Sequence, residues 1–434
     1  MRLRTERNTR MTASSLTRTV LDSSLFINEL LNNSLSAFKY PQRRFITELV
    51  YGTVRNLKHV DFWISLAFKK PLKRIDHTLL SLLRTSTYQM IFMSSRDPAL
   101  IVNETTELTK KVCSRKASGF INFILREILR LDPTRENMEE HFKDDKIAFL
   151  QTFYSQPEWL FKRLEKIAPE NSLEAYLENI NKPLGISLRV EGEGTRDMVI
   201  ESLISKGAIA EPAKDCVYGI YTHKAVNYDM IEEFENVYIQ DESSQLAVYE
   251  MDIQKGDHIL DLCAAPGGKT LFASYLTGDS GSITAVDVNR HKLEMLAETA
   301  IKYKKKNIDI KLHDSTVLRP EWENKFDKVL LDAPCSALGT IRRHPEVKWL
   351  KNEKDPSKMA GLASKILDKS ANYVKKGGIL MFAVCTFTIE ETTDQIQNFL
   401  IKHPEYKVEI AYNTVSSIHD QRDTFFICKM RRII

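Results

Sequence analysis

The chain has 434 residues, 43% of them hydrophobic and 28% charged, with a net charge of +4. This balance is typical of a globular protein with two or three domains. No apolar run reaches the roughly 18 residues of a membrane span. The six cysteines form neither a CxxC pair nor a zinc-spaced Cys/His cluster. We therefore expect no membrane association, no disulfide framework, no metal site and a reducing, cytoplasmic location.

The charge is unevenly distributed along the chain. Residues 1–132 hold 22 Lys and Arg against 11 Asp and Glu, so this part carries +11 and the remainder −7. The arginines of residues 1–20 would suit a transit peptide, but we interpret them as the basic start of a helix. A basic module joined to an acidic one predicts binding to a polyanion such as nucleic acid. A solvated basic helical surface is the alternative.

Residues 1–132 are predicted to be an all-helical domain. Apolar residues recur at helical spacing from Leu16 to Leu35, and further apolar runs follow. The other expected helices are Phe45–Val54, Val60–Phe68, Leu79–Phe92 and Phe120–Leu131. Proline breaks helices, so we expect the helices to be separated at Pro41, Pro71 and Pro98.

Residues 133–237 are predicted to be a small α+β module. It begins after Asp132 and combines a helix at Pro157–Ile167 with short strands at Leu184–Val190 and Val217–Tyr221. Turns are expected at Gly192, Gly194 and Gly207.

Residues 238–434 are predicted to form an α/β domain with a doubly wound, parallel, Rossmann-like sheet. Apolar runs that end in polar residues alternate there with helical stretches. The expected strands are Ile259–Cys263, Ser282–Val288, Ile308–His313, Lys328–Asp332 and Ile379–Thr386. Ligands of such sheets bind at the carboxyl ends of the strands, so we expect the site there.

A turn of small residues follows the first of these strands. Ile259–Thr270 reads ILDLCAAPGGKT, and its small residues would let the backbone approach a ligand closely. The spacing is neither that of a Walker loop nor that of a GxGxxG fingerprint. Asp287, Asp314 and Asp332 end the next three strands. An acid after the second strand suits ribose hydroxyls, and helix capping is the alternative role.

Two cysteines lie at the ends of neighbouring predicted strands. Cys335 follows Asp332 in DAPCSALG, and Cys385 ends the last predicted strand in AVCT. Two thiols at adjacent strand ends indicate covalent catalysis. A lone cysteine is usually a small buried hydrophobe, which is our interpretation of Cys113, Cys216 and Cys428.

The sequence DLCAAPGGKT resembles motif I of the RNA 5-methylcytosine methyltransferases, which bind S-adenosyl-L-methionine on a seven-stranded sheet. The resemblance implies S-adenosyl-L-methionine as cofactor. The implied contacts are the ribose hydroxyls with Asp287, the adenine with Asp314, the reacting centre with Asp332, and the methionine part with a loop of Cys263, Ala264, Ala265, Pro266, Gly267, Gly268 and Lys269.

The chemistry of this family explains why a thiol is needed. C5 of cytosine is a weak nucleophile, and addition of a thiolate to C6 makes it reactive; a base then removes the C5 proton before elimination frees the cysteine. Such a thiol needs a low pKa or a nearby base. Cytosine N3 needs a hydrogen-bond donor, which a protonated Asp332 could provide.

Either cysteine could be the nucleophile on chemical grounds. DNA cytosine methyltransferases use the Pro-Cys cysteine, which here is Cys335, whereas the RNA family uses the cysteine after the fifth strand, which here is Cys385. The motif I match favours Cys385, with Cys335 assisting product release. The acidic pair Glu390-Glu391 after Cys385 is also a habit of the RNA family.

The resemblance covers nearly the whole chain. Residues 44–55, 82–89 and 119–126 resemble the all-helical antitermination factor NusB, residues 155–160 the start of an RNA-binding module, and residues 240–246 the entry into the methyltransferase domain. This order is that of the bacterial small-subunit ribosomal RNA methyltransferase B (RsmB, or Sun) family. It implies a monomer that binds small-subunit ribosomal RNA, naked or in an assembly intermediate, through domains 1–132 and 133–237. Arg342 and Arg343, beside the cleft, suit phosphate contacts.

Two alternatives stay open. An amine methyltransferase acting on RNA would favour an Asn/Asp-Pro-Pro-aromatic loop, where this chain has Asp332-Ala333-Pro334-Cys335. An RNA-binding scaffold with an inactive methyltransferase domain would not need the catalytic residues. Cofactor binding with and without RNA distinguishes the scaffold from the enzyme.

Overall fold

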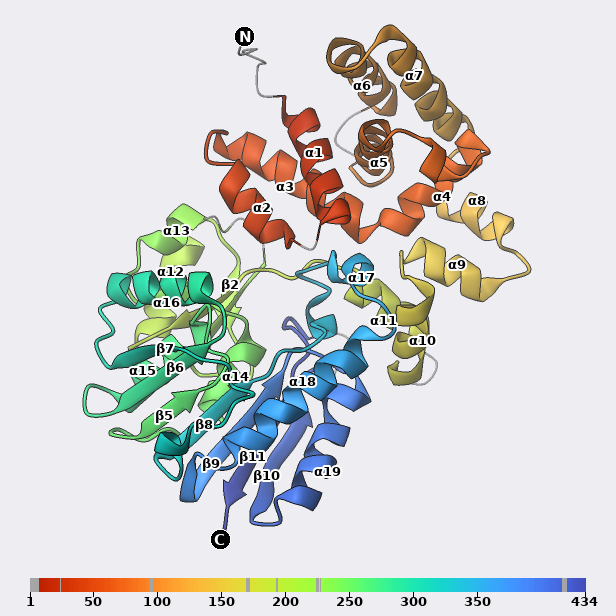
Figure 1. Cartoon of the computed structure of the whole chain (residues 1–434). Helices are drawn as coiled ribbons and strands as arrows, with labels where there is room; N and C mark the ends of the chain where they lie inside the picture. Colours follow the sequence, from red (N-terminus) through yellow and green to blue (C-terminus); the bar gives the residue numbers. More distant parts are fainter. Residues whose placement is uncertain are drawn as a thin grey trace. The chain divides into compact units, whose positions relative to one another are not determined.

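The computed structural model describes residues 8–434 except 24, 94–96, 169–171, 193, 224, 225, 227 and 416–419 (Figure 1). By its internal contacts the chain divides into two compact units. The first comprises residues up to 182 together with 344–352, and the second comprises residues 183–343 and 353–434. Within the described ranges, no helix is long and apolar enough to cross a membrane.

The first unit is helical, as predicted for the N-terminal part of the chain. Helices cover the expected ranges 45–54, 60–68 and 79–92, and they cover the expected ranges 120–131 and 157–167 to within one residue. The full set is α1 (Thr9–Asp22), α2 (Ile27–Ser34), α3 (Tyr40–Arg55), α4 (Leu57–Phe68), η1 (Leu72–Arg74), α5 (His77–Phe92), α6 (Pro98–Val112), α7 (Arg115–Arg130), α8 (Arg135–His141), α9 (Lys146–Phe153), α10 (Glu158–Ile167), α11 (Leu173–Ile180) and, from the later segment, α17 (Val347–Leu350).

Two details go beyond the helical prediction. The stretch Leu16–Leu35 forms two helices, because the backbone is extended at Ser23, and Asp22 and Ser23 are residues that favour helix ends over helix interiors. Pro41 and Pro98 mark helix boundaries, as predicted, and they lie in the first turns of α3 and α6. A first turn tolerates proline because its N–H groups have no partner within the helix.

Residues 344–352 pack in the helical unit although they interrupt the second unit in sequence. The buried Lys348 ammonium donates hydrogen bonds to the carbonyl oxygens of Arg55 (2.8 Å) and Ser155 (2.9 Å) and to Asn181 Oδ1 (3.1 Å). Burial lowers the pKa of Lys348 well below its usual value. Three oxygen acceptors compensate for the water that this ammonium loses, and they connect the segment to three places in the helical unit.

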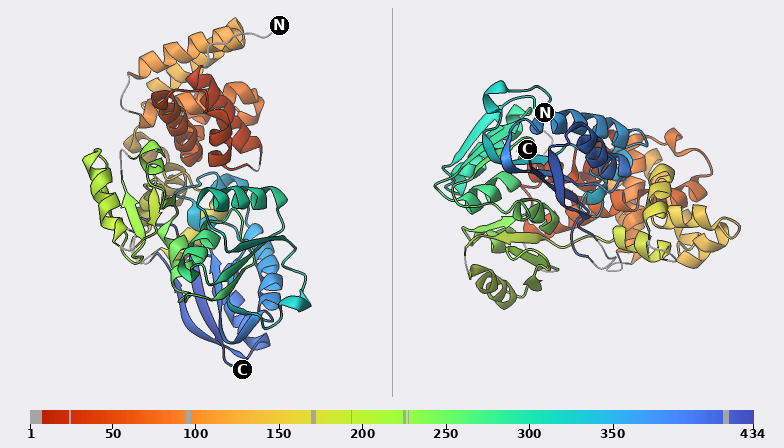
Figure 2. Two further views of the ribbon diagram at one scale, coloured as in Figure 1. Left: turned by 90° about the vertical axis from the view of Figure 1, so that its left-hand side faces the viewer. Right: turned by 90° about the horizontal axis from the view of Figure 1, so that it is seen from below.

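A small antiparallel sheet opens the second unit, with strand order β2-β3-β1-β4. Its elements are β1 (Ser187–Val190), α12 (Thr195–Ser205), β2 (Ala210–Pro212), β3 (Gly219–Thr222), α13 (Tyr228–Glu232) and β4 (Val237–Ile239). The predicted strands at 184–190 and 217–221 are thus confirmed within a few residues. In both views of Figure 2 this yellow-green sheet lies beside the green and blue strands of the larger sheet.

The larger sheet has seven strands in the order β10-β11-β9-β8-β5-β6-β7. The pairs from β9 to β7 are parallel, and both pairs of β11 are antiparallel, which confirms the predicted mostly parallel sheet. The strands are β5 (His258–Asp261), β6 (Ser282–Asp287), β7 (Ile308–Leu312), β8 (Phe326–Asp332), β9 (Val374–Val384), β10 (Tyr406–Asn413) and β11 (Phe426–Arg432). The chain order reverses between β5 and β8, and ligands of open α/β sheets bind at such a switch point.

Helices cover this sheet, so alternate strand residues enter different apolar clusters. Leu260 and Leu331 belong to one cluster, and Ile259 and Leu330 to the other. Burial on both faces explains why these strands read as continuous apolar runs. The elements are α14 (Glu242–Tyr249), α15 (Gly268–Thr277), α16 (Arg290–Lys302), η2 (Pro320–Trp322), η3 (Leu338–Thr340), α18 (Asp355–Ser370), η4 (Ile389–Glu391) and α19 (Thr393–Lys402). Figure 1 shows α18 and α19 in front of the strands.

Candidate active site

The turn between β5 and α15 has a backbone that requires glycine. Gly267 has φ +112°, a region that side chains rarely adopt, and a Cβ there would lie 2.2 Å from Leu296 Cδ1. The predicted small-residue loop, Cys263 to Lys269, therefore runs close against α16. The peptide bond between Ala265 and Pro266 is cis.

This loop lines a cavity of about 180 Å³ at the switch point of the sheet. The lining residues are Gln240, Ser244, Asp261, Asp332 and the loop residues Cys263, Ala264, Ala265, Pro266, Gly267, Gly268 and Lys269. The sequence prediction had included the loop and Asp332 but not Gln240 and Ser244, which come from the entry into α14.

Asp261 is one of the acidic residues that line the cavity. Its Oδ2 accepts a hydrogen bond from Thr270 Oγ1 (2.7 Å), while its buried Oδ1 has no partner among the described residues. Burial raises the pKa of Asp261 to about 7. An orphaned carboxylate oxygen in a cavity suits a cationic ligand group. The methionine part of S-adenosyl-L-methionine carries an ammonium and a sulfonium, so these residues fit that cofactor.

The remaining strand-end carboxylates lie around this turn. Asp287 accepts hydrogen bonds from the backbone N–H of Ala265 (3.2 Å) and of Asn289 (2.8 Å), so it braces the cofactor loop. Asp314 is exposed and accepts from the N–H and hydroxyl of Thr316, which lower its pKa. Neither residue lines the cavity; Asp287 is the last residue of β6, and Asp314 follows β7 by two residues.

A lysine–carboxylate pair links the cofactor loop to the end of β8. Lys269 Nζ lies 2.6 Å from Asp332 Oδ2 and 5.0 Å from the centre of the Phe425 ring. Burial alone would lower the pKa of Lys269, but the charge of Asp332 and its hydrogen bond raise it above the usual value. The pair places an ammonium donor and a carboxylate acceptor beside the cavity.

The two predicted cysteines meet. The Sγ atoms of Cys335 and Cys385 are 3.2 Å apart, and both thiols are free. The hydrogen bond with Cys335, followed by burial and the charge of Asp332, raises the pKa of Cys385 well above its usual value, whereas Lys269 lowers it. Burial and the charges of Asp261 and Asp332 also raise the pKa of Cys263. Cys263 makes no sulfur contact of this kind among the described residues.

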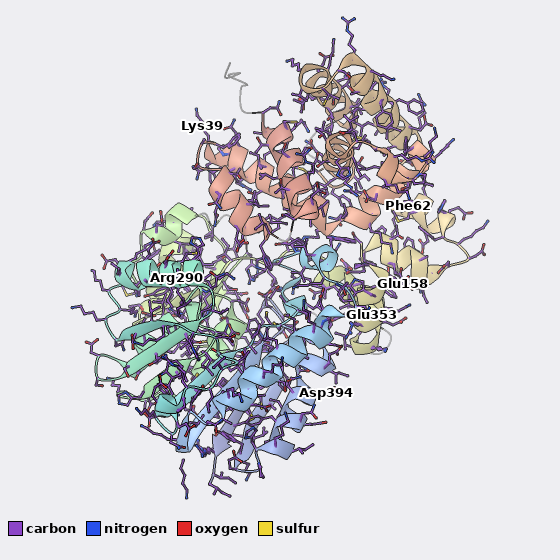
Figure 3. The ribbon with its side chains drawn as sticks, viewed as in Figure 1. Lys39, Phe62, Glu158, Arg290, Glu353 and Asp394 are labelled. Carbon is purple, nitrogen blue, oxygen red and sulfur yellow. The ribbon has the colours of Figure 1, made fainter. Side chains whose placement is uncertain are left out.

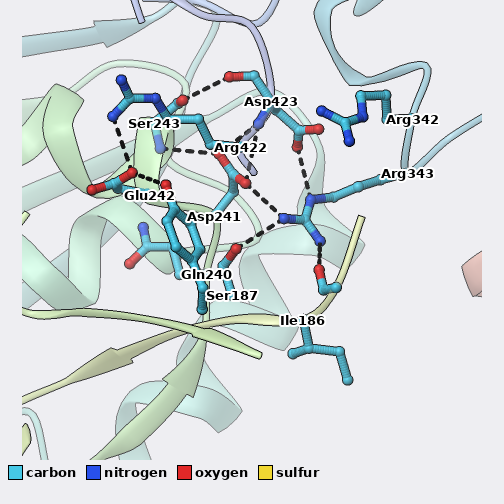
Figure 4. Close-up of polar contacts among 12 residues, drawn as sticks. Ile186, Ser187, Gln240, Asp241, Glu242, Ser243, Arg342, Arg343, Arg422 and Asp423 are labelled. Atoms are coloured by element: carbon cyan, nitrogen blue, oxygen red, sulfur yellow. Dashed lines mark hydrogen bonds and ion pairs between the residues drawn. The ribbon is translucent and has the colours of Figure 1, made fainter. Parts of the chain in front are cut away.

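The two arginines after the Pro-Cys loop have different surroundings (Figure 4). Arg343 donates to Asp241 Oδ2 (2.8 Å), Asp423 Oδ2 (3.2 Å), the carbonyl oxygen of Gly185 (2.6 Å) and Ser187 Oγ (2.9 Å). Its guanidinium thus joins the Pro-Cys loop to the small sheet and to the loop before β11. Arg342 is partly exposed, and its Nη1 donates to the carbonyl oxygen of Asp420 (2.7 Å).

Other residues that shape the site carried no specific signal in the sequence. Phe425 and Asp423 precede a strand that was not predicted, and Gly339 and Glu391 act through contacts between the loops that follow the neighbouring strands β8 and β9. The acidic pair at 390–391 was noticed only as a family feature. The threonines around Glu390-Glu391 were the local hint in the sequence that a carboxylate there could accept hydrogen bonds from hydroxyl groups.

The parallel sheet, the glycine turn at its switch point and the orphaned carboxylate define an S-adenosyl-L-methionine-dependent methyltransferase. Comparison with known families agrees. Family models match three consecutive parts of the chain: "NusB family" at residues 7–130, "Methyltr_RsmF/B-like, ferredoxin-like domain" at 156–229 and "16S rRNA methyltransferase RsmB/F" at 248–431.

Relatives that match over nearly the whole chain are named ribosomal RNA small subunit methyltransferase B. The chain is 31% identical to the probable ribosomal RNA small subunit methyltransferase B of Bacillus subtilis over 90% of each chain. It is 30% identical to ribosomal RNA small subunit methyltransferase B of Pectobacterium atrosepticum over 98% of each. The chain therefore belongs to the ribosomal RNA small subunit methyltransferase B family, as the sequence motifs predicted. It is a methyltransferase of ribosomal RNA that depends on S-adenosyl-L-methionine.

Solved structures share the fold. The crystal structure of PH0851 matches with a TM-score of 0.80 at 22% identity, covering 98% of this chain and 99% of that one. The crystal structure of NSun6 from Pyrococcus horikoshii with SFG matches with a TM-score of 0.56 at 18% identity, covering 64% of this chain and 98% of that one.

Proposed function

We propose that this protein methylates C5 of a specific cytosine in small-subunit ribosomal RNA through a covalent bond between Cys385 and C6 of the base. The observation that carries the proposal is the thiol pair, with Cys335 and Cys385 3.2 Å apart beside the Lys269–Asp332 pair. An amine or a hydroxyl group accepts a methyl group without help from a thiol. C5 of cytosine is a weak nucleophile, so its methylation requires a thiolate that first adds to C6 of the ring.

The proposed reaction begins with transfer of the Cys385 thiol proton to the carboxylate of Asp332, whose negative charge acts on this thiol. The contact with Cys335 and burial hold this thiol in its protonated form, and Lys269 is the group that favours the thiolate. The thiolate adds to C6, and the electron pair of the C5–C6 double bond becomes available at C5. In this proposal the protonated Asp332 would donate a hydrogen bond to N3 of the base, and Lys269, whose Nζ lies 2.6 Å from Asp332 Oδ2, would hold that carboxyl in place.

The cofactor supplies an electrophilic methyl group that C5 accepts. A base then takes the proton from C5, the electrons re-form the C5–C6 double bond, and the bond from C6 to Cys385 breaks. We assign Cys335 to this release, because its sulfur touches the leaving sulfur and can exchange a proton with it. Cys385 is preferred as nucleophile for two reasons: the motif I resemblance, and its electrostatic interaction with Lys269.

The cofactor contacts are proposed from the same turn. The residues Cys263, Ala264, Ala265, Pro266, Gly267, Gly268 and Lys269 would face the methionine part, with Asp287 on the ribose, Asp314 near the adenine and Asp332 near the reacting centre. Asp261 joins this set because the residue lines the cavity and its buried Oδ1 has no hydrogen-bond partner among the described residues.

Substrate recognition is proposed to involve the modules 1–132 and 133–237, which precede the methyltransferase domain 238–434. Arg342 and Arg343 stay predicted RNA contacts. Arg342 is the better candidate for a phosphate, because four donations of Arg343 go to protein oxygens. We further propose a monomer that acts in the cytoplasm, on ribosomal RNA that is naked or in an assembly intermediate.

Methyl transfer from labelled S-adenosyl-L-methionine to unmodified small-subunit ribosomal RNA, followed by nucleoside analysis, tests this function. We expect the label in 5-methylcytidine, with none for Cys385→Ala and full transfer for the control Cys113→Ala. Cys113 was predicted to be buried, but it is exposed in the helical unit. Label in another nucleoside would contradict the C5 chemistry. Absence of label on both naked RNA and assembled small subunits would favour the scaffold alternative.

A further inference from the structure

A buried carboxylate lies behind the two cysteines. Glu391 ends the short helix η4, six residues after Cys385, and is 1% exposed. Its carboxylate touches neither thiol by any described contact. Instead, it accepts hydrogen bonds from the residue that follows each cysteine. These two residues, Ser336 and Thr386, lie in the loops after β8 and β9 and are 50 positions apart in the sequence.

The first set of bonds holds the Pro-Cys loop. Glu391 Oε1 accepts from the backbone N–H of Ser336 (2.6 Å), and Oε2 accepts from Ser336 Oγ (2.6 Å). Ser336 is fully buried and follows Cys335 directly in the chain. The Ser336 N–H belongs to the peptide bond between Cys335 and Ser336, so this hydrogen bond fixes the backbone from which the Cys335 side chain extends.

The second set holds the turn after β9. Glu391 Oε2 also accepts from Thr386 Oγ1 (3.2 Å) and Thr388 Oγ1 (2.7 Å), while Ser336 Oγ and Thr386 Oγ1 lie 3.0 Å apart. Thr386 directly follows Cys385. The residues next to the two cysteines, Ser336 and Thr386, therefore share one carboxylate and one direct contact.

A backbone contact joins the same loops on another side. The N–H of Gly339 donates to the carbonyl oxygen of Cys385 (3.0 Å), and a Cβ at position 339 would lie 2.9 Å from that oxygen and 1.9 Å from the carbonyl oxygen of Thr424. Gly339 thus allows the loop after β8 to approach the turn after β9 closely, and the hydrogen bonds of Glu391 fix the position of one relative to the other. A side chain at position 339 would fill the space between the loops, whereas a substitution of Glu391 leaves that close approach unfilled.

We propose that Glu391 is the positioning residue that holds the thiols of Cys335 and Cys385 in contact. This inference rests on the proposed function for its kinetic consequence, since both adduct formation and adduct release need the two sulfurs in place. The physical reason is that an ionised carboxylate accepts several hydrogen bonds and donates none. Four donors from two loops converge on it, and without it they would be buried and unpaired.

Substitutions at this position should differ in a defined way. In Glu391→Gln one oxygen becomes an NH2 group, which faces donors and must force either the Ser336 N–H or the three hydroxyls to reorient. In Glu391→Asp the carboxylate is one methylene shorter and cannot reach both loops. Thr388→Val is milder, because it removes one donor from the Cys385 side and leaves the carboxylate in place.

The experiment reads thiol geometry and kinetics separately. Capture by phenylarsine oxide, which bonds two adjacent thiols and releases water, reports whether Cys335 and Cys385 still meet, with the captured peptides identified by mass spectrometry. Single-turnover reactions with small-subunit ribosomal RNA report the rates of adduct formation and release. Glu242→Gln is the control for loss of a buried carboxylate, since Glu242 is also fully buried and accepts four hydrogen bonds. Asp394→Asn, on α19 (Figure 3), is the control for a nearby acid.

We expect Glu391→Gln to slow arsenical capture, adduct formation and adduct release by at least about tenfold each, the loss typical of one or two buried hydrogen bonds. Thr388→Val should slow each by about two- to fivefold, and the two controls should leave all three unchanged in the folded fraction. If Glu391→Gln does not fold, Thr388→Val alone carries the test.

The outcomes separate the two claims. Unaltered capture in Glu391→Gln, or unaltered capture in Thr388→Val where only that variant folds, would overturn the positioning role and leave the proposed function standing. Slowed capture, with a wild-type protein that forms no RNA adduct, would support the positioning role and contradict the covalent mechanism. A loss in Glu242→Gln equal to that in Glu391→Gln would overturn the positioning role, because the effect would then be one of stability.

Discussion

The sulfur atoms of Cys335 and Cys385 lie 3.2 Å apart at the carboxyl ends of the neighbouring parallel strands β8 and β9. The separation is far longer than the roughly 2.05 Å of a disulfide. Neighbouring thiols without a bond between them can exchange a proton, and one can act on a group attached to the other. The division of the catalytic work between two thiols that we propose is consistent with this geometry.

Cofactor binding should depend on pH through Asp261. Burial raises the pKa of Asp261 to about 7, so the carboxyl is mostly protonated below that pH. A cationic ligand favours the ionised form, so binding expels a proton and affinity rises with pH until about 7 and then levels. Between pH 6 and pH 8 we expect S-adenosyl-L-methionine to bind up to about tenfold more tightly.

Isothermal titration at several pH values measures this dependence, and Asp261→Asn should remove it. S-adenosyl-L-homocysteine, which lacks the sulfonium charge, should show a smaller slope. An affinity independent of pH in the wild-type protein would mean that Asp261 does not change its protonation when the cofactor binds.

Gly267→Ala should damage the cofactor loop. The φ of +112° disfavours any side chain, and the new Cβ would collide with Leu296, so we expect about 1–3 kcal/mol lower stability and at least about tenfold weaker cofactor binding. Gly361→Ala is the matched control. It lies inside α18 with no atom near its would-be Cβ, and we expect it to stabilise the protein by about 0.5–1 kcal/mol. Denaturant unfolding and cofactor titration measure both variants, and equal behaviour of the two would contradict the role of the turn.

The sequence predicted those parts of the site that follow a strand directly. Asp332, Cys335 and Cys385 were found because an apolar run ended in each case at a chemically unusual residue, and parallel strands bring such ends to one edge. The glycine turn was found because its composition is rare. These features depend on local sequence, and the structure brings the three residues together.

Other parts depend on contacts between distant residues and were not predicted. Strands β10 and β11 escaped notice because charged residues interrupt their apolar pattern, as in Tyr406–Asn413. Arg343 looked like an exposed base, but its partners lie up to 158 positions away. Residues 344–352 pack with the helical unit through the buried Lys348, and nothing in their local sequence indicates it.

Arg342 and Arg343 should respond differently to substitution. Arg343→Gln removes the guanidinium charge that pairs with the two nearly buried carboxylates of Asp241 and Asp423, so we expect about 3 kcal/mol lower stability. Arg342→Gln should leave stability within about 0.5 kcal/mol of the wild type. It should weaken RNA binding and reduce the slope of log affinity against log salt by about 0.7–0.9. Denaturant unfolding and RNA binding at several salt concentrations check both, and a stable Arg343→Gln variant with a reduced salt slope would instead make Arg343 the phosphate contact.

The most direct test of the covalent mechanism is the amount of RNA–protein adduct that survives denaturation after incubation with unmodified small-subunit ribosomal RNA and S-adenosyl-L-methionine. The proposed roles, with Cys385 as nucleophile and Cys335 assisting release, predict that Cys335→Ala accumulates adduct with methylated cytosine, because release fails, and that Cys385→Ala forms none. Adduct in Cys385→Ala but not in Cys335→Ala would reverse the two roles. Adduct-free loss of activity in both variants would contradict the division of work between the two thiols.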